Sequence, residues 1–363
     1  IIFTASGLYF GKDILVVLGA EGNILFLSWE YLFVIVLGLP FMIFSGFFRA
    51  ILAGEGDMKF PMIVAGLGTI LNILLDPIFI FKLESFGGIG LGLGVKGAAL
   101  ATVICQGVVF LIFIFMLFIK DHAYITFRIK DFSPSKEILW DIIKVGFPAS
   151  VSMIIMALGQ GVFNKILIYY SPQAVAAYQV AGRLDMLIFL PIFAIAGALT
   201  TLVGMFYGAQ EIDRLNQIVK YGISAVFIIT VVSSALVFAF APTFVMLFTD
   251  DMQIRIIAVE FLRLMALVYP LIAIGINAGR IMQGLGKGIP VLVITTIRVL
   301  GVSAPLAWYF SFVLKKPIVW NWYAMMISSG VAVIIGVTWV VLEMNKINKL
   351  QEVTHEPAFR TGN

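Results

Sequence analysis

The chain is 363 residues long, with 61% hydrophobic and 12% charged residues. This balance excludes an ordinary soluble globular domain, in which about a quarter of the residues are charged. The formal net charge of +4 does not indicate a nucleic-acid partner, because the basic residues of a membrane protein gather in its cytoplasmic loops. One cysteine, Cys105, and two histidines, His122 and His355, leave almost nothing for a disulfide, a metal centre or Cys/His catalysis.

Ten apolar segments recur along the chain, each long enough to cross a hydrocarbon core of roughly 30 Å as a helix. The sequence therefore predicts an all-α polytopic membrane protein. A polar cytoplasmic tail, residues 344–363, follows the last segment. The predicted spans are residues 1–19, 25–50, 61–82, 95–119, 146–170, 175–207, 222–241, 256–279, 290–313 and 320–343.

The longest polar connection, residues 121–145, is predicted to carry a short amphipathic helix on the membrane surface. Ser133 can cap this helix with Pro134 at its first position. Isoleucine and leucine side chains then recur at helical spacing between residues 138 and 143. A plain linker remains the alternative for residues 121–132.

The positions of Lys and Arg predict the orientation. Fourteen of these residues fall on one side of the predicted spans and five on the other. Because basic residues favour the cytoplasmic side, we expect the 121–145 linker and the C-terminus to lie in the cytoplasm. The protein is then a multi-pass protein of the cell membrane.

The chain contains an internal repeat. A shift of 230 residues places residues 30–56 on 260–286, so that Pro40 meets Pro270 and Gly56 meets Gly286. Matched Pro and Gly are harder to obtain by chance than matched apolar residues. Six spans separate the copies, which indicates two six-helix bundles related by a parallel repeat.

The repeat divides the chain into an N-terminal bundle, residues 1–120, and a C-terminal bundle, residues 146–343. The N-terminal copy lacks counterparts for two helices and part of a third. We therefore expect about 90 to 110 further residues before Ile1 and twelve helices in the complete protein.

Five stretches follow one another in a characteristic order. They are RAILAGEGDMKFPMI (49–63), LNILLDPIFIF (71–81), GVKGAALATVI (94–104), FRIKDFSPSKEILWDIIKVGFP (127–148) and AGRLDMLIFLPIFAIAGALTTLVGMFYGAQ (181–210). In this order they resemble the MATE family of multidrug and toxic compound extrusion transporters, in its archaeal and DinF-like type. The resemblance covers essentially the whole chain. It implies twelve helices in two bundles facing a central cavity, which export amphipathic, often cationic compounds in exchange for H⁺ or Na⁺.

An aspartate, Asp76, lies within the apolar stretch 71–81. A carboxylate deep in the bilayer is costly, and it is therefore a functional-site hypothesis by default. Asn72 lies four residues earlier on the same helix face, and Pro77 has no N–H to offer the carbonyl of Ile73. These oxygen-bearing groups suit Na⁺, and the carboxylate suits a proton equally well.

The resemblance gives this cluster a role. It implies that Asn72 and Asp76 form part of a cation site, with Thr102 contributed by the following helix and another aspartate by the first helix of the complete protein. The alternative is that Asp76 merely bonds a neighbouring helix. No other metal and no organic cofactor are expected.

A second polar group lies in the predicted C-terminal bundle. Its members are Gln160, Asn164 and Lys165 in the fifth segment and Gln179, Arg183 and Asp185 in the sixth. Arg183 and Asp185 point in different directions, so we expect either one to pair with a neighbouring helix, for example Asp185 with Lys165. Because the resembled family often has an acid at the position of Asp185, these residues are candidates for substrate contact or lobe coupling. A structural bridge near the helix end is the alternative.

The sequence departs from the NorM-type branch of the family, whose acids in the seventh and tenth helices correspond here to apolar stretches near Met156 and Ile272. Arg263 and Arg298 are expected to snorkel or to pair with acids such as Glu260. The interpretation is thus a cation-coupled exporter of small amphipathic molecules, monomeric and without an obligate protein partner.

Two other functions compete with this interpretation. A flippase for lipid-linked saccharides would need a cavity rich in Arg and Lys, and the intramembrane basic residues are few. A membrane-embedded enzyme would need a nucleophile or acid/base pair, and no paired carboxylates on one helix are present.

Overall fold

The computed structural model describes residues 2–17, 20–82, 90–120 and 133–355. These residues fold as two compact units, residues 1–132 and 133–363. Their secondary structure is helical, apart from an isolated bridge between Lys82 and Leu91. The first unit contains α1 (Ile2–Val17), α2 (Gly22–Gly54), α3 (Lys59–Ile80), α4 (Gly94–Ile114) and the π-helical turn η2 (Phe115–Ile119).

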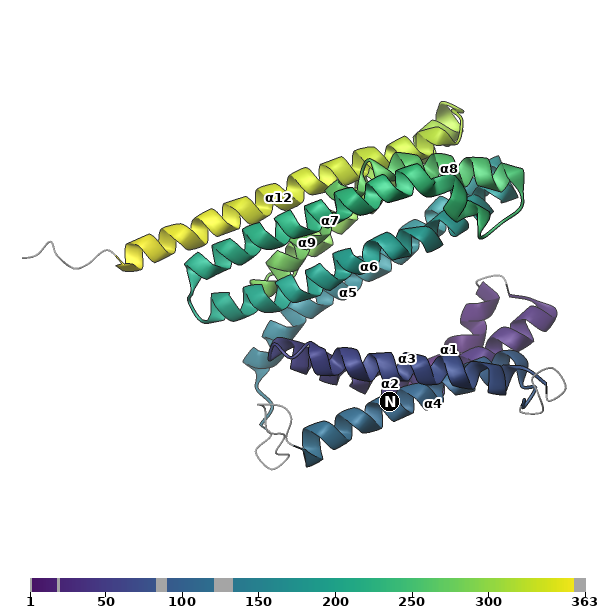
Figure 1. The fold of residues 1–363 in the computed structure, drawn as a ribbon, viewed down its shortest axis with the longest axis horizontal. Helices are drawn as coiled ribbons and strands as arrows, with labels where there is room; N and C mark the ends of the chain where they lie inside the picture. The colour runs from purple at the N-terminus through teal and green to yellow at the C-terminus, as the bar shows by residue number, and fades with distance from the viewer. Residues whose placement is uncertain (1, 18–19, 83–89, 121–132, 356–363) are drawn as a thin grey trace, which may run out of the picture. The chain divides into compact units, whose positions relative to one another are not determined.

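The second unit contains the remaining helices, with α6, α7, α9 and α12 packed along one another (Figure 1). The elements are α5 (Lys136–Tyr170), α6 (Pro172–Gly208), α7 (Ile212–Met246), α8 (Met252–Ala266), α9 (Tyr269–Gly284), α10 (Ile289–Thr296), η4 (Ile297–Ser303), α11 (Ala304–Trp308), η5 (Tyr309–Val313) and α12 (Val319–His355).

The described residues confirm a polytopic membrane protein. Eight of their helices are long and apolar enough to span a bilayer, and α8 with α9, which are bent by 59° at their junction, count as a ninth if the pair is one broken span. The bend coincides with Pro270 at the start of α9, where the ring cannot continue the preceding helix. Of the predicted first span, 1–19, the structure describes the helix α1 of 16 residues.

The internal repeat recurs in the backbone of two turns. After α2, the N–H groups of residues 55, 56 and 57 donate to the carbonyls of residues 51, 53 and 52 at 3.0, 3.1 and 2.9 Å. After α9, the N–H groups of residues 285, 286 and 287 donate to those of residues 281, 283 and 282 at 3.0, 2.9 and 2.8 Å. Both turns place a glycine at positive φ, 88° for Gly56 and 76° for Gly286, a conformation that favours glycine.

The C-terminal unit has an aromatic core. Tyr178 of α6, Phe261 of α8 and Trp322 of α12 are buried, and their ring centroids lie 4.9 to 6.1 Å apart. Such edge-to-face and stacked pairs stabilise a core beyond the area that they bury. They hold together three helices that are distant in the sequence.

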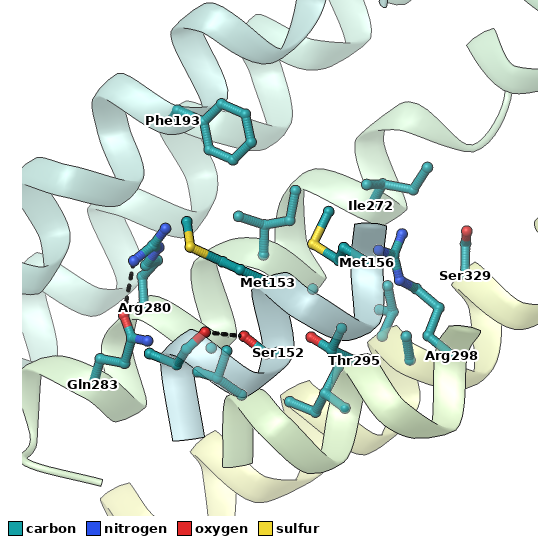
Figure 2. Close-up of a pocket in the computed structure, with 18 of the residues that line it drawn as sticks. Ser152, Met153, Met156, Phe193, Ile272, Arg280, Gln283, Thr295, Arg298 and Ser329 are labelled. Carbon is teal, nitrogen blue, oxygen red and sulfur yellow. Dashed lines mark hydrogen bonds between the residues drawn. The ribbon is translucent and has the colours of Figure 1, made fainter. Parts of the chain in front are cut away.

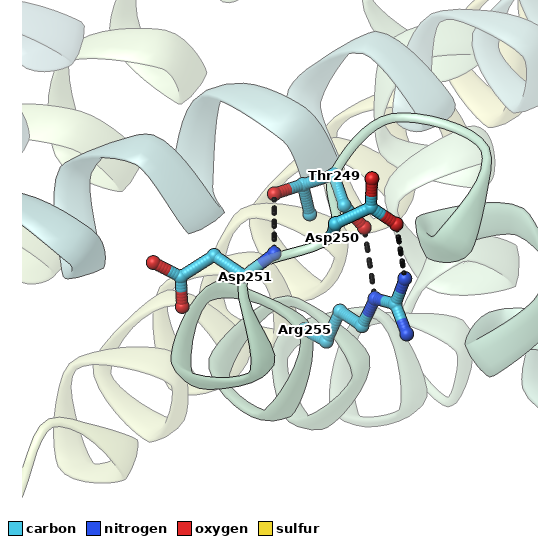
Figure 3. A network of polar contacts seen from close by, with 4 residues as sticks. All are labelled: Thr249, Asp250, Asp251 and Arg255. Atoms are coloured by element: carbon cyan, nitrogen blue, oxygen red, sulfur yellow. Dashed lines mark hydrogen bonds and ion pairs between the residues drawn. The ribbon is translucent and has the colours of Figure 1, made fainter.

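Hydrogen bonds in the turn between α7 and α8 favour the start of a new helix at α8. Asp251 caps α8 by accepting hydrogen bonds from the N–H groups of Gln253 and Ile254 at 2.8 and 3.2 Å. Arg255 reaches back across the turn and donates to the Asp250 carboxylate at 2.9 Å and to the Thr249 carbonyl at 2.8 Å (Figure 3). The network fixes the turn between α7 and α8.

Two predicted boundaries are wrong. The separate amphipathic helix of the 121–145 linker is the first part of α5, which runs unbroken from Lys136 to Tyr170 and is capped by Ser135 rather than Ser133. Residues 121–132 lie outside the described residues. The membrane-surface position of the start of α5 stays a prediction.

The predicted tail is also largely helical, because α12 continues to His355. Within it, Asn348 accepts a hydrogen bond of 2.8 Å from Asn216 of α7, and Glu343, directly before it, forms an ion pair with Lys287. Apolar residues in the same stretch, Met344 and Ile347, are buried. Packing against neighbouring helices thus extends the helix into a segment that composition alone indicates to be a tail.

We predict that Gly284→Ala destabilises the C-terminal unit by roughly 1 to 3 kcal/mol. At Gly284 a Cβ would lie 2.7 Å from the Thr200 carbonyl oxygen and 2.9 Å from the Val203 side chain, so α6 and α9 would have to move apart. The control is Gly182→Ala on α6, where a Cβ meets nothing within 4 Å. Thermal unfolding of the purified protein in detergent measures both variants. Equal unfolding midpoints would contradict the tight α6–α9 contact.

Candidate functional site

Asp76 and Asn72 form a pair on α3. The Asn72 side-chain amide donates a hydrogen bond of 3.2 Å to a carboxylate oxygen of Asp76, and both residues are half-buried. Pro77 lies within the helix directly after the carboxylate, so the carbonyl of Ile73 lacks its usual helical donor. The Asn72–Asp76 bond thus joins an amide and a carboxylate on one helix face, and the contribution of the Ile73 carbonyl stays a prediction.

The neighbouring helix α4 supplies Thr102 and Cys105. The Thr102 hydroxyl donates a hydrogen bond of 3.0 Å to the Ala98 carbonyl. The lone pairs of its oxygen stay available to a ligand. Cys105, one turn later, is buried, and its thiol interacts electrostatically with Asn72 and Asp76. The described hydrogen bond of Thr102 is to its own helix rather than to Asp76, and its place in the ion site stays a prediction.

No group of three His, Cys, Asp or Glu side chains occurs among the described residues. The hydrogen-bond partner of Asp76 among the described residues, Asn72, is a neutral amide.

Three of the polar candidates, Gln160, Asn164 and Gln179, form hydrogen bonds between α5 and α6. The Tyr178 hydroxyl donates to the Gln160 side chain at 3.3 Å, and the Gln179 amide donates to the Asn164 side chain at 3.2 Å. These bonds join α5 to α6 within the membrane region, where each unpaired amide would be costly.

Asp185 has a different partner from the one suggested by sequence. The Tyr269 hydroxyl of α9 donates a hydrogen bond to its carboxylate, and the Phe189 ring lies 6.0 Å from the Tyr269 ring, centroid to centroid. Lys165 and Arg183 are exposed, and neither forms an ion pair within the described part of the chain. A neutral phenol thus replaces the expected basic partner.

A cavity of about 320 Å³ opens within the C-terminal unit between α5, α6, α9, α10, η4 and α12. Met153, Met156 and Phe193 line it together with Ile272, and two arginines, Arg280 and Arg298, point into it (Figure 2). Its volume lies at the lower end of the range for small-molecule sites. Arg298 is therefore a cavity residue, and the expectation that it pairs with an acid such as Glu260 is wrong.

Sequence reasoning missed Tyr269, Arg280 and the role of Arg298. Tyr269 gave no signal, because a tyrosine beside a proline in an apolar span also suits a membrane interface. Arg280 was counted with the cytoplasmic loop basic residues. Its position four residues after Ile276 on one helix was the signal that both line one surface, since residues four apart lie on the same helix face.

We predict that Tyr269→Phe lowers the free energy of unfolding by about 1 to 3 kcal/mol, because the Asp185 carboxylate loses its hydroxyl donor in a buried setting. The measurement is a double-mutant cycle with Asp185→Asn, read by thermal or denaturant unfolding in detergent. The pair is coupled if the double variant loses less stability than the two single variants together. Strict additivity would show that the bond does not hold α6 to α9.

The sequence matches a known protein family and known proteins. A profile of the MatE family matches residues 1–78 and 148–309. The chain is 27% identical to the probable multidrug resistance protein YoeA of Bacillus subtilis, over 96% of the chain and 76% of YoeA. It is 31% identical to the probable multidrug resistance protein NorM of Thermotoga maritima, over 79% of the chain and 61% of NorM.

A solved structure agrees with these matches. It is described as the outward-facing conformation of a multidrug resistance MATE family transporter of the MOP superfamily. That structure superposes with a TM-score of 0.89 at 32% identity, over 95% of this chain and 76% of the other. The chain spans less than two thirds of the length of NorM. Because the family profile covers well over half of its residues, the chain belongs to the MatE family.

Proposed function

We propose that the protein is a cation-coupled antiporter that exports amphipathic small molecules across the cell membrane. The observation that carries the proposal is the Asn72–Asp76 hydrogen bond of 3.2 Å within a membrane-spanning helix. An intramembrane carboxylate is expensive and is retained where it binds or relays a cation. The names of the relatives, multidrug resistance proteins, support drugs and toxic compounds as the cargo.

The coupling ion is H⁺ or Na⁺. A Na⁺ ion would take oxygen ligands from the Asp76 carboxylate, the Asn72 amide, the Ile73 carbonyl and the Thr102 hydroxyl. A proton would need the carboxylate alone. Either cation drives transport by alternating access only if it binds one conformation more tightly than the other.

The substrates are proposed to be amphipathic and cationic, as the family resemblance implies. Asp185, with its neighbours Gln160, Asn164 and Gln179, is the proposed contact for substrate or for coupling between the bundles. A monomer with its C-terminus in the cytoplasm suits this scheme. The lipid-linked flippase has less support, since the relatives reported above are named for multidrug resistance.

We predict that Asp76→Asn abolishes gradient-driven efflux of the cationic dye rhodamine 6G. The amide keeps the shape and the bond to Asn72 but cannot bind a proton or neutralise Na⁺. The assay uses inside-out vesicles with protein expressed from the complete gene, energised by a proton gradient or a sodium gradient in separate runs. The gradient that drives wild-type efflux identifies the coupling ion.

The control is Asp213→Asn, the same substitution at an exposed position in the first turn of α7. It should leave efflux near the wild-type level at equal expression. Undiminished efflux in Asp76→Asn would return Asp76 to a packing role and remove the basis of the proposal.

We also predict that Thr102→Val raises the ion concentration needed for half-maximal efflux roughly fivefold, because one ligand oxygen worth about 1 kcal/mol is lost. The control is Thr69→Val on α3, whose exposed hydroxyl bonds only the Ala65 carbonyl, at 3.0 Å. Efflux at a series of proton or sodium concentrations separates an affinity change from a change in maximal rate. Identical curves for the two variants would remove Thr102 from the ion site.

A further inference from the structure

Two arginines share the cavity of the C-terminal unit without an acidic partner. Arg280 of α9 donates a hydrogen bond of 2.9 Å to the Gln283 side chain. Arg298 of η4 makes no hydrogen bond or ion pair with any described residue, and no Asp or Glu is among the described residues that line the cavity. The cavity therefore presents two positive charges and no negative one.

This arrangement needs compensation. A guanidinium group stays charged at any physiological pH, and an unpaired charge within a membrane-spanning bundle is costly. Basic side chains in such positions usually pair with an acid or face an aqueous pathway or ligand. With no acid in the lining, an anion entering the cavity is the partner that satisfies both arginines.

The backbone at Arg298 is a second, independent sign of a functional site. Arg298 lies in the π-helical segment η4, residues 297–303, and π-helical segments are rare and frequent at functional sites. The segment is fixed in place by α5, because a Cβ at Gly159 would lie 2.2 Å from the Val299 side chain. The unusual helix geometry and the close packing hold Arg298 toward the cavity.

The rest of the lining suits an apolar body. Met153, Met156 and Phe193 face the cavity, and in Figure 2 the two methionines lie between Arg280 and Arg298. Methionine side chains adapt to ligands of different shape. The α9 part of the lining, from Ile272 to Gln283, covers about 16 Å at 1.5 Å per residue, which is enough for an extended or polycyclic molecule.

We propose that this cavity binds amphipathic organic anions. A carboxylate, sulfonate or phosphate group accepts hydrogen bonds from Arg298, for which the forked guanidinium geometry is suited, and the apolar body packs on Met153 and Met156. Arg280 and Gln283 receive a second polar group at the other end. Binding of the anion does not depend on the proposed export function. That function determines only whether the bound anion is carried across the membrane.

The test compares two dyes with the same xanthene body, the anion fluorescein and the cation rhodamine 6G. Equilibrium dialysis measures the binding of each to the purified protein in a non-ionic detergent. In Arg298→Gln we expect the dissociation constant of fluorescein to rise about tenfold or more, as for a lost hydrogen bond to a charged group. Rhodamine binding should stay the same or tighten.

The matched control is Arg263→Gln on α8. Arg263 lies over the Phe238 ring, 5.7 Å from its centroid, and is not part of the cavity lining. Its substitution should leave fluorescein binding unchanged. Arg298→Lys keeps the charge and should lose less affinity for fluorescein than Arg298→Gln. Retained binding in Arg298→Lys shows that substitution at this position does not by itself unfold the protein.

Competition identifies the source of the natural anion. Displacement of fluorescein by short-chain phosphatidylglycerol but not by phosphatidylcholine would assign the cavity to an anionic lipid headgroup. Resistance to both lipids, with fluorescein bound, would assign it to soluble amphiphiles.

The proposal is overturned if wild type does not bind fluorescein, or if Arg298→Gln and Arg263→Gln bind it as wild type does. It is also overturned if rhodamine binding weakens as much as fluorescein binding. Rhodamine efflux in vesicles tests the export function separately. The proposal of anion binding and the proposal of export can therefore be contradicted independently.

Discussion

A carboxylate within a membrane-spanning helix is the constraint on which the account depends. The hydrocarbon core does not tolerate Asp76 unless nearby groups or a cation compensate its charge. The chain meets part of this cost on the same helix, through the Asn72 amide at 3.2 Å and through Pro77, which exposes a carbonyl oxygen one turn away. The neighbouring α4 carries Cys105, whose thiol interacts electrostatically with Asn72 and Asp76. The compensation is neutral among the described residues, and this leaves room for a cation.

The internal repeat shows how two copies of one unit have diverged. The turns after α2 and α9 share the same hydrogen-bond pattern, and α3 and α10 begin at Lys59 and Ile289, 230 residues apart. In the first copy the helix that follows is regular and carries Asp76. In the second copy it is interrupted by π-helical segments and carries Arg298. The two copies thus carry charges of opposite sign on related helices.

Much of this fold could be predicted from the sequence, because span length, Pro and Gly punctuation and the repeat are local or periodic signals. The Asn72–Asp76 pair could likewise be predicted, since a spacing of four residues fixes a shared helix face. Contacts between segments that are distant in the chain could not be predicted from the sequence. The bond from Tyr269 to Asp185 joins residues 84 apart in the sequence, and the cavity of Arg298 depends on how five helices pack. The continuation of α12 through Ile347 also rests on tertiary contacts that override a polar composition.

The central claim is that binding of the coupling cation and binding of the exported compound are linked through conformation. Linkage is reciprocal, so a cation that favours one state must weaken a substrate that favours the other by the same factor. The most direct measurement is the dissociation constant of a cationic substrate dye for the purified protein in detergent, determined across a range of sodium concentrations and of pH. The account predicts that the dissociation constant rises with sodium or with acidity in wild type and is constant in a protein without the Asp76 carboxylate. A dissociation constant that responds to neither ion in wild type would contradict it.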